Sequence, residues 1–171
     1  MTKKFELQAT IDPLTQLLNR RGMFERIKYE TGRSKRYESS LVFLIADVDH
    51  FKKINDQYGH EVGDEVLLSL SNYFRKSIRK QDFIARWGGE EFLFLLPQTS
   101  LDSAIKVAEK IRAGVEKENS FSQIKPLQVS ISIGVAKVVD FSNTQQAINL
   151  ADKRLYTAKK HGRNRVVATG E

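Results

Sequence analysis

The chain contains the stretch Phe83-Ile84-Ala85-Arg86-Trp87-Gly88-Gly89-Glu90-Glu91-Phe92-Leu93-Phe94-Leu95-Leu96, in which two apolar runs flank a double glycine. Apolar runs joined by a glycine turn predict a β-hairpin. We therefore expect strands over residues 83–87 and 92–96 with a tight turn between them. The turn carries two adjacent carboxylates, Glu90 and Glu91.

Three further strands are expected outside this hairpin. The run Leu41-Val42-Phe43-Leu44-Ile45-Ala46 is apolar throughout, which predicts a strand buried on both faces. From Leu127 to Val135, apolar residues alternate with Gln, Ser and Gly, the pattern of a strand with one buried face. A short strand is expected at Arg165-Val166-Val167.

Helices are predicted by apolar residues at helical spacing. Val66, Leu70 and Phe74 recur every four residues and place one apolar stripe along a helix. The expected helices run from about Asn19 to Tyr37, from Gly63 to Ile78, from Ser100 to Lys117, and over residues 147–158. The resulting order βαββαβ, with an extra N-terminal helix and an extra C-terminal strand, predicts a ferredoxin-like α+β fold. In this arrangement we expect an antiparallel sheet with its helices on one face.

Length and composition indicate one enzyme-sized domain. The 171 residues suit a single domain over residues 12–171, preceded by the remnant of an upstream linker helix over residues 1–11. There are no cysteines, which excludes disulfides and thiolate chemistry. No apolar run reaches the roughly 20 residues of a membrane span, and the start lacks a signal peptide. We therefore expect a cytoplasmic domain without direct membrane insertion.

The net charge of +7 suits an anionic ligand without identifying it. Nucleotides, nucleic acids and acidic membranes all carry such charge. No stretch interleaves aromatic residues with lysine and arginine as single-strand-binding surfaces do. Nucleic acid is therefore not the expected partner.

At least three carboxylates are expected to converge at one end of the sheet. Asp47 and Asp49 end the first strand and point to the same side, because side chains at i and i+2 share a face. If that strand neighbours the hairpin, Glu90 and Glu91 join them. Hard oxygen ligands beside phosphate suit Mg²⁺ or Mn²⁺. The alternative is a set of solvated charges at strand ends.

Residues after the first strand are suited to a nucleotide. Exposed backbone N–H groups near Lys52 can cradle phosphates, and Phe51 is expected to face inward. Asn55 supplies an amide and Asp64 a carboxylate. A carboxylate that accepts from N1–H and the 2-amino group selects guanine over adenine. Asp64 could equally be a plain helix N-cap.

A basic segment follows the last helix. It reads Lys159-Lys160-His161-Gly162-Arg163-Asn164-Arg165, and Gly162 is placed as a helix C-cap. Lys159 and Arg163 are candidates for phosphate binding. Cations also stabilise a helix C-terminus, so a structural role stays open for them.

These motifs together resemble one known family. Arg86-Trp87 followed by Gly88-Gly89-Glu90-Glu91-Phe92 resembles the signature of the GGDEF family of bacterial diguanylate cyclases, in its GGEEF variant. The other family motifs occur in the same order, as Asp12-Pro13-Leu14-Thr15, Asn19-Arg20-Arg21, Asp47-Val48-Asp49-His50-Phe51-Lys52, Ile54-Asn55-Asp56, Gly59-His60, Gly63-Asp64, Ser132-Ile133-Gly134, Ala158-Lys159 and Gly162-Arg163-Asn164. The resemblance covers residues 12–167.

The resemblance implies a fold like the palm of nucleotidyl cyclases and a site with two divalent ions, Mg²⁺ or Mn²⁺, per half-site. Asp47, the backbone carbonyl of Val48 and Glu90 would hold the metals, with Glu91 in support. Asp49 is not among the metal ligands that the family implies. Glu90 is also the candidate for removing the proton from the attacking 3′-hydroxyl.

The nucleotide set is implied in the same way. Asn55 and Asp64 would recognise guanine, with His60 close to the nucleotide. Gly88 and Gly89 would let the hairpin approach it. The full implied set comprises Phe51, Asn55, His60, Asp64, Gly88, Gly89, Lys159 and Arg163, with Lys52 as a catalytic residue that helps neutralise the triphosphate.

The implied reaction joins two GTP molecules into cyclic di-GMP and releases two pyrophosphates. Each domain would bind one GTP, so the resemblance implies a homodimer. Arg79-Lys80-Gln81-Asp82 resembles the family's RxxD inhibitory site, at which bound cyclic di-GMP inhibits the enzyme. Arg79 and Asp82 can also form an ordinary i, i+3 ion pair.

Two departures from the family pattern stand out. Gln16 occupies a position where glycine is common, which affects the turn before the first helix. Family members normally carry an N-terminal sensor or dimerising module, and we expect residues 1–11 to be the remnant of its linker; the resemblance implies that such a module can anchor the full-length protein to a membrane.

The sequence leaves two other functions open. The first is a catalytically inactive receptor for GTP or cyclic di-GMP, against which the intact Asp47, Glu90 and Lys159 argue. The second is an enzyme that makes an adenine-containing dinucleotide, against which Asp64 argues.

Overall fold

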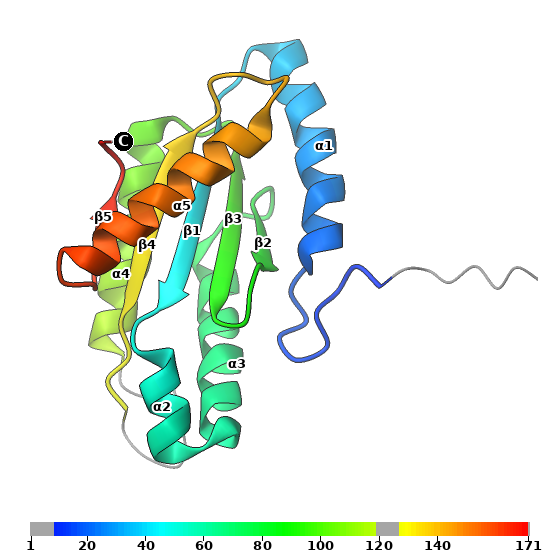
Figure 1. Cartoon of the computed structure of the whole chain (residues 1–171). Helices are drawn as coiled ribbons and strands as arrows, with labels where there is room; N and C mark the ends of the chain where they lie inside the picture. Colours follow the sequence, from blue (N-terminus) through cyan, green and yellow to red (C-terminus); the bar gives the residue numbers. More distant parts are fainter. Residues whose placement is uncertain (1–8, 119–126, 171) are drawn as a thin grey trace, which may run out of the picture.

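The strand β1 (Leu41–Val48) is buried along its whole length and lies at the centre of the sheet. In this computed structural model, which describes residues 9–118 and 127–170, the strand order is β2-β3-β1-β4-β5 (Figure 1). The other strands are β2 (Phe83–Arg86), β3 (Glu91–Pro97), β4 (Ile131–Lys137) and β5 (Val166–Val167). All pairings are antiparallel except that of β4 with β5, so the sheet is mixed.

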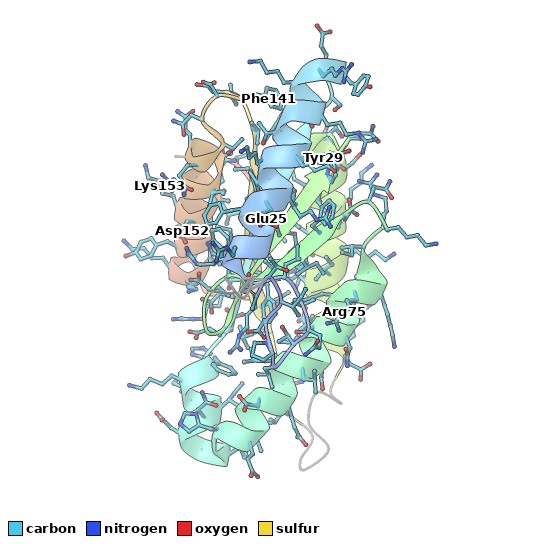
Figure 2. The ribbon with its side chains drawn as sticks, turned by 90° about the vertical axis from the view of Figure 1, so that its right-hand side faces the viewer. Glu25, Tyr29, Arg75, Phe141, Asp152 and Lys153 are labelled. Atoms are coloured by element: carbon cyan, nitrogen blue, oxygen red, sulfur yellow. The ribbon has the colours of Figure 1, made fainter. Side chains whose placement is uncertain are left out.

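Helices cover both faces of this sheet. One face packs against α1 (Arg20–Tyr37) and α5 (Thr144–Lys160), which lie side by side in Figure 2. The other face packs against α3 (His60–Ser77) and α4 (Leu101–Lys117), with the short α2 (Phe51–Tyr58) at its end. The core helices α3 and α4 lie on one face as expected, and the added helices α1 and α5 cover the other face, so the helices are packed around the sheet. Alternate residues of β1 are apolar on both sides, so each side needs a cover.

The strand β4 differs from its prediction in position and burial. It begins at Ile131, four residues later than expected, and only Lys137 is exposed. A Cβ on Gly134 would lie 1.9 Å from the carbonyl oxygen of Ala151 and 2.5 Å from the nitrogen of Leu155. The backbone of α5 therefore lies directly on β4. This contact buries the face that the alternating pattern assigned to solvent.

Helix starts follow their caps where a cap exists. The side chain of Asn19 accepts from Gly22 N at 2.9 Å, and that of Ser100 accepts from Ser103 N at 3.1 Å. The helix α2 was not predicted. It has only eight residues, and its N-cap His50 makes no side-chain cap hydrogen bond. Gly59, at φ +91°, separates α2 from α3. Asp64 is therefore not the N-cap of α3, which begins at His60.

The predicted helix over residues 1–11 lies outside the described residues except for its last three. These are not helical, and Ile11 forms an isolated bridge with Leu18.

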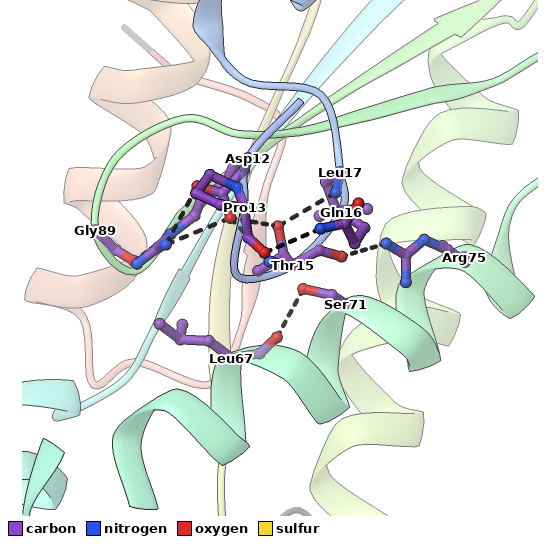
Figure 3. Close-up of polar contacts among 10 residues, drawn as sticks. Asp12, Pro13, Thr15, Gln16, Leu17, Leu67, Ser71, Arg75 and Gly89 are labelled. Carbon is purple, nitrogen blue, oxygen red and sulfur yellow. Dashed lines mark hydrogen bonds and ion pairs between the residues drawn. The ribbon is translucent and has the colours of Figure 1, made fainter. Parts of the chain in front are cut away.

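Residues 12–17 form a turn that contacts the hairpin through polar side chains (Figure 3). Asp12 accepts from the Thr15 backbone N–H at 2.9 Å and hydroxyl at 2.8 Å. Arg86 lies 3.4 Å from both oxygens of Asp12 and donates to the carbonyl of Gly89 at 3.0 and 3.1 Å. Gln16 has φ +60°, in the region that favours glycine. The glycine that is common at this position in the family would adopt this left-handed conformation without strain.

Candidate active site

The carboxylates of β1 and of the hairpin meet at one end of the sheet. Asp47 lies opposite Glu91 in the β1–β3 register. The N–H of Val48 donates to the carbonyl of Glu90 at 3.2 Å. The structure therefore brings Asp47, Glu90 and Glu91 together, as the strand order requires.

Asp47 is only 4% exposed, and its charge is held by one cation. Its Oδ2 lies 2.7 Å from Nζ of Lys159, on the last turn of α5. Burial raises the pKa of Asp47 to about 6; the hydrogen bond and charge of Lys159 oppose this rise, and the charges of Glu90 and Glu91 add to it. One lysine does not offset the cost of keeping this carboxylate charged and buried.

Glu91 shares this environment. Its pKa is raised, chiefly by burial and then by the charge of Asp152 on α5, while Lys159 and Arg20 lower it. In residues 9–118 and 127–170, no three carboxylate or imidazole side chains are arranged to hold a metal ion by themselves. Among the described residues, the side chains of this cluster therefore do not form a complete metal site.

The hairpin turn is fixed by the backbone and by Arg20. Trp87 N donates to the carbonyl of Glu91 at 2.7 Å. Nε of Arg20 donates to the carbonyl of Trp87 at 2.8 Å, and its guanidinium carbon lies 4.1 Å from the centre of the indole ring. A Cβ on Gly89 would meet nothing within 4 Å, and neither Gly88 nor Gly89 has a positive φ. The turn therefore has open space beside Gly89. Neither packing against the described residues nor a left-handed backbone requires glycine at this position.

The proposed guanine residues lie around the junction of α2 and α3. Oδ1 of Asn55 is buried and has no hydrogen-bond partner among the described residues. A Cβ on Gly63 would lie 1.9 Å from that oxygen, so the glycine makes room for the amide. Asp64 follows Gly63 and is exposed, as is His60, while Phe51 is half-buried. An unpaired buried acceptor is costly unless a ligand completes it.

The cationic residues are placed differently from one another. Lys159 pairs with Asp47, whereas Lys52 is exposed on the first turn of α2. Arg163 follows Gly162 in the turn after α5, where its N–H donates to the carbonyl of Ala158 at 2.9 Å. This bond closes a Schellman-type helix end, with Gly162 at φ +120°. The predicted C-cap position of Gly162 is thus one residue late, since the C-cap is His161.

Asp49 does not join the acidic cluster as a free carboxylate. It is 5% exposed and accepts from the hydroxyls of Ser130 and Ser132 and from the backbone N–H of Asn164. The first expectation for Asp49, convergence with Asp47 on a cation, therefore fails because its oxygens are already bonded within the protein.

Two residues of the site were not predicted from the sequence. Arg20 belongs to the quoted Asn19-Arg20-Arg21 motif, which could have identified it. Asp152 carries no local signal, because its relevance arises from the packing of α5 beside the hairpin. Both line a cavity of about 290 Å³ next to Glu91.

Arg79 and Asp82 form the ion pair that their spacing allows. Oδ1 of Asp82 lies 2.8 Å from Nη2 of Arg79, which also donates to the carbonyl of Pro97 and the hydroxyl of Thr99. The Asp82 side chain is 3% exposed and that of Arg79 is 46% exposed. The pair lies beside the end of β3, at the opposite end of the sheet from Asp47.

Comparison with known proteins agrees with this geometry. Residues 9–165 match the family model described as diguanylate cyclase, GGDEF domain. The chain belongs to the GGDEF family. No helix in the described part of this GGDEF domain is long and apolar enough to cross a membrane.

The similarity extends over most of the domain. The chain is 40% identical over 159 residues to the diguanylate cyclase DgcP of Pseudomonas aeruginosa. The aligned region covers 93% of this chain and 24% of DgcP. The chain thus spans about a quarter of the length of that relative. The diguanylate cyclase SiaD of Pseudomonas aeruginosa, solved with its activator SiaC, has 40% identity and a TM-score of 0.89, covering 94% of this chain and 62% of SiaD.

An isolated domain is also similar. The active GGEEF domain of a diguanylate cyclase from Vibrio cholerae has 34% identity and a TM-score of 0.84, covering 91% of this chain and 99% of that domain. The palm-like α+β fold is therefore that of the solved cyclase domains.

The raised pKa of Asp47 predicts a pH-dependent stability. A carboxyl whose pKa rises on folding costs the folded state free energy once it ionises, so its effect grows as the pH rises from about 3.8 to about 6. We expect Asp47→Asn to increase the free energy of unfolding by about 1–3 kcal/mol at pH 7.5 and by little at pH 4.

Urea unfolding at the two pH values measures this difference. Asp64→Asn, an exposed carboxylate on α3, is the matched control for the loss of one negative charge. Equal effects of the two substitutions at pH 7.5 would contradict the role given to the burial of Asp47.

Proposed function

We propose that this domain is the catalytic unit of a diguanylate cyclase, which condenses two GTP molecules into cyclic di-GMP and releases two pyrophosphates. The single observation that carries the proposal is the meeting of buried Asp47 with Glu90 and Glu91 beside the open glycine turn. The relatives reported above support the same chemistry. We also propose that the domain lies in the cytoplasm, because its proposed substrate GTP is found there.

The donor set fits two divalent ions, Mg²⁺ or Mn²⁺, in each half-site. Asp47, the carbonyl of Val48 and Glu90 would hold them, with Glu91 in support. Burial raises the pKa of Asp47, and its acidic neighbours raise it further, so a divalent ion beside this carboxylate would stabilise its charged form. Such ions neutralise phosphate charge and lower the pKa of a hydroxyl when bound.

Guanine is proposed to lie at the α2–α3 junction. The Asn55 amide, whose Oδ1 is buried against Gly63 without a partner among the described residues, would turn toward the base, and the exposed carboxylate of Asp64 would accept a second hydrogen bond. Guanine presents two adjacent donors on its Watson–Crick edge, whereas adenine lacks both N1–H and the 2-amino group. Phe51 begins α2 and His60 begins α3, so both belong to the two helices that form this junction.

The phosphates are proposed to lie along the hairpin turn and the end of α5. The open space at Gly89 lets the triphosphate approach the backbone. Lys159, Arg163 and Lys52 supply positive charge, and Lys159 is already positioned beside Asp47. Binding then exchanges part of the Lys159–Asp47 attraction for attraction to phosphate.

In the proposed reaction, Glu90 accepts the proton of the 3′-hydroxyl of its own GTP. The 3′-oxygen attacks the α-phosphorus of the GTP on a facing copy, the bond to pyrophosphate breaks, and a second equivalent step closes the ring. Since each domain binds one GTP, the active form is a homodimer. We propose that an N-terminal sensor or dimerising module outside this chain brings the two copies together.

A non-catalytic receptor for GTP or cyclic di-GMP is the second candidate. It would keep the guanine residues but would have no use for the costly burial of Asp47 beside Glu90. That burial favours the enzyme.

Glu90→Gln tests the enzyme most simply. It keeps the size of the side chain and removes its charge and basicity, so we expect cyclic di-GMP formation to fall by about 10²-fold or more with little change in unfolding midpoint. The control is Glu25→Gln, an exposed acid of α1 (Figure 2). Activity in the Glu90 variant equal to that of the control would rule out its proposed role.

Feedback by product is proposed at Arg79 and Asp82. Arginine can pair bidentately with a guanine edge or phosphate, but here bound product must replace the bonds of Arg79 to Asp82, Pro97 and Thr99. The site is remote from Asp47, so inhibition would act on the arrangement of the two domains.

We expect Arg79→Ala to raise the cyclic di-GMP concentration for half-inhibition at least about tenfold and to leave the initial rate unchanged. Lys80→Ala, a neighbouring exposed cation, is the control. Initial rates measured with and without added product distinguish the two, and unaltered inhibition in the Arg79 variant would remove the feedback site.

A further inference from the structure

The side chain of Asp49 is fully engaged within the protein at the edge of the candidate active site. Its Oδ1 accepts from the hydroxyl of Ser132 at 2.6 Å. Its Oδ2 accepts from the hydroxyl of Ser130 at 2.7 Å and from the backbone N–H of Asn164 at 3.0 Å. Three donors around a side chain that is 5% exposed leave it poorly placed to bind a metal ion or a nucleotide. Its partners must therefore explain its presence.

The partner Asn164 belongs to a strained turn. Gly162, Arg163 and Asn164 have φ values of +120°, +64° and +46°. The left-handed conformation costs a non-glycine residue roughly 1–2 kcal/mol, so Arg163 and Asn164 need compensating contacts. The N–H of Asn164 bonds to Asp49, and its side-chain oxygen accepts from Nη1 of Arg112 on α4 at 2.9 Å. Asp49 thus helps to hold this turn, together with Arg112 and with Arg165, whose Nε donates to the carbonyl of Arg163 at 3.0 Å.

The same segment is attached to the end of β1 at two points. Lys159, before the turn, pairs with Asp47 at 2.7 Å, and Asn164, within the turn, bonds to Asp49 at 3.0 Å. Arg163 lies between these attachments. Because Asp47 and Asp49 are two residues apart, the distance between the acidic cluster and the turn is set by a short rigid piece of backbone.

We infer that Asp49 is a positioning residue for phosphate binding: through the N–H of Asn164 it holds Arg163 where the triphosphate must lie, at a fixed distance from Asp47. Ser130 and Ser132 orient the carboxylate for this bond. The inference rests on the proposed function, because it assigns Asp49 to the binding of the same GTP. It gives the second aspartate after β1 a task different from that of Asp47.

Asp49→Asn removes the charge and one acceptor from this network. We expect KM for GTP to rise about tenfold, since hydrogen bonds to charged groups contribute that much, while kcat stays within about twofold. The Mg²⁺ concentration for half-maximal rate at saturating GTP should not change. A metal ligand would behave oppositely, with a large loss of kcat and a shifted Mg²⁺ requirement.

A serine pair separates positioning from folding stability. Ser132 and Ser71 are both fully buried, and each hydroxyl donates one hydrogen bond, at 2.6 and 2.7 Å, but that of Ser71 goes to Leu67 within α3. We expect Ser132→Ala to raise KM about threefold and Ser71→Ala to leave KM unchanged, although both lower the unfolding midpoint. Equal KM values for the two variants would overturn the inference.

A double-mutant cycle tests the route through Arg163. If Asp49 acts by placing that side chain, Asp49→Asn should change KM by less than about twofold in an Arg163→Ala background. An undiminished tenfold effect in that background would contradict the inference.

The affinity for a GTP analogue with a non-hydrolysable α,β-bridge, measured by calorimetry, tests the inference without turnover. Tighter binding by the wild type than by Asp49→Asn supports the inference even if no cyclic di-GMP forms, a result that would refute only the cyclase. Turnover by the wild type with equal analogue affinities would refute only the positioning role. A wild type that does not bind the analogue overturns both.

Discussion

The structure depends on a carboxylate that is buried at the end of a strand covered on both faces. Helices on each side of β1 leave Asp47 only 4% exposed, so its charge must be balanced by the protein or by a ligand. Lys159 supplies a partial balance, and Glu90 and Glu91 oppose it. The pKa of Asp47 therefore remains raised, and the site retains an attraction for further positive charge. In the proposed function, the binding of a cation offsets this loss of stability.

The surrounding segments are arranged around that constraint. The glycine turn leaves open space beside the carboxylates, and Arg86 ties this turn to Asp12 in the N-terminal segment (Figure 3). Asp49 ties the turn after α5 to the same end of β1. The site is thus assembled from four separate pieces of chain, each fixed by hydrogen bonds to a strand end. Asp49, Glu90 and Arg163 all lie in turns, and these hydrogen bonds fix the turns to the strands.

Part of this arrangement is predictable from sequence because it depends on local rules. The hairpin at Gly88-Gly89, the strand over residues 41–46 and the helix that begins near Asn19 all follow from periodicity and turn chemistry, and all are confirmed. The convergence of Asp47 with Glu91 needed only the neighbouring order of two strands. The apolar pattern of this strand also predicted its burial on both faces, but not which helices cover each face.

Other parts depend on contacts between distant segments. The burial of β4 arises from the close approach of α5 to Gly134, and the partners of Asp49 lie 81 to 115 residues along the chain. No local pattern encodes such pairings. The family resemblance omitted Asp49 from the metal ligands without a reason, and the three hydrogen bonds supply one. The most direct measurement of the central claim is the rate of cyclic di-GMP formation per protein molecule, from GTP and Mg²⁺, across a wide range of protein concentration. A rate per molecule that rises with concentration and levels off as dimers form is the expected result. No product at any concentration, even when the domains are fused to a dimerising coiled coil, would contradict the account.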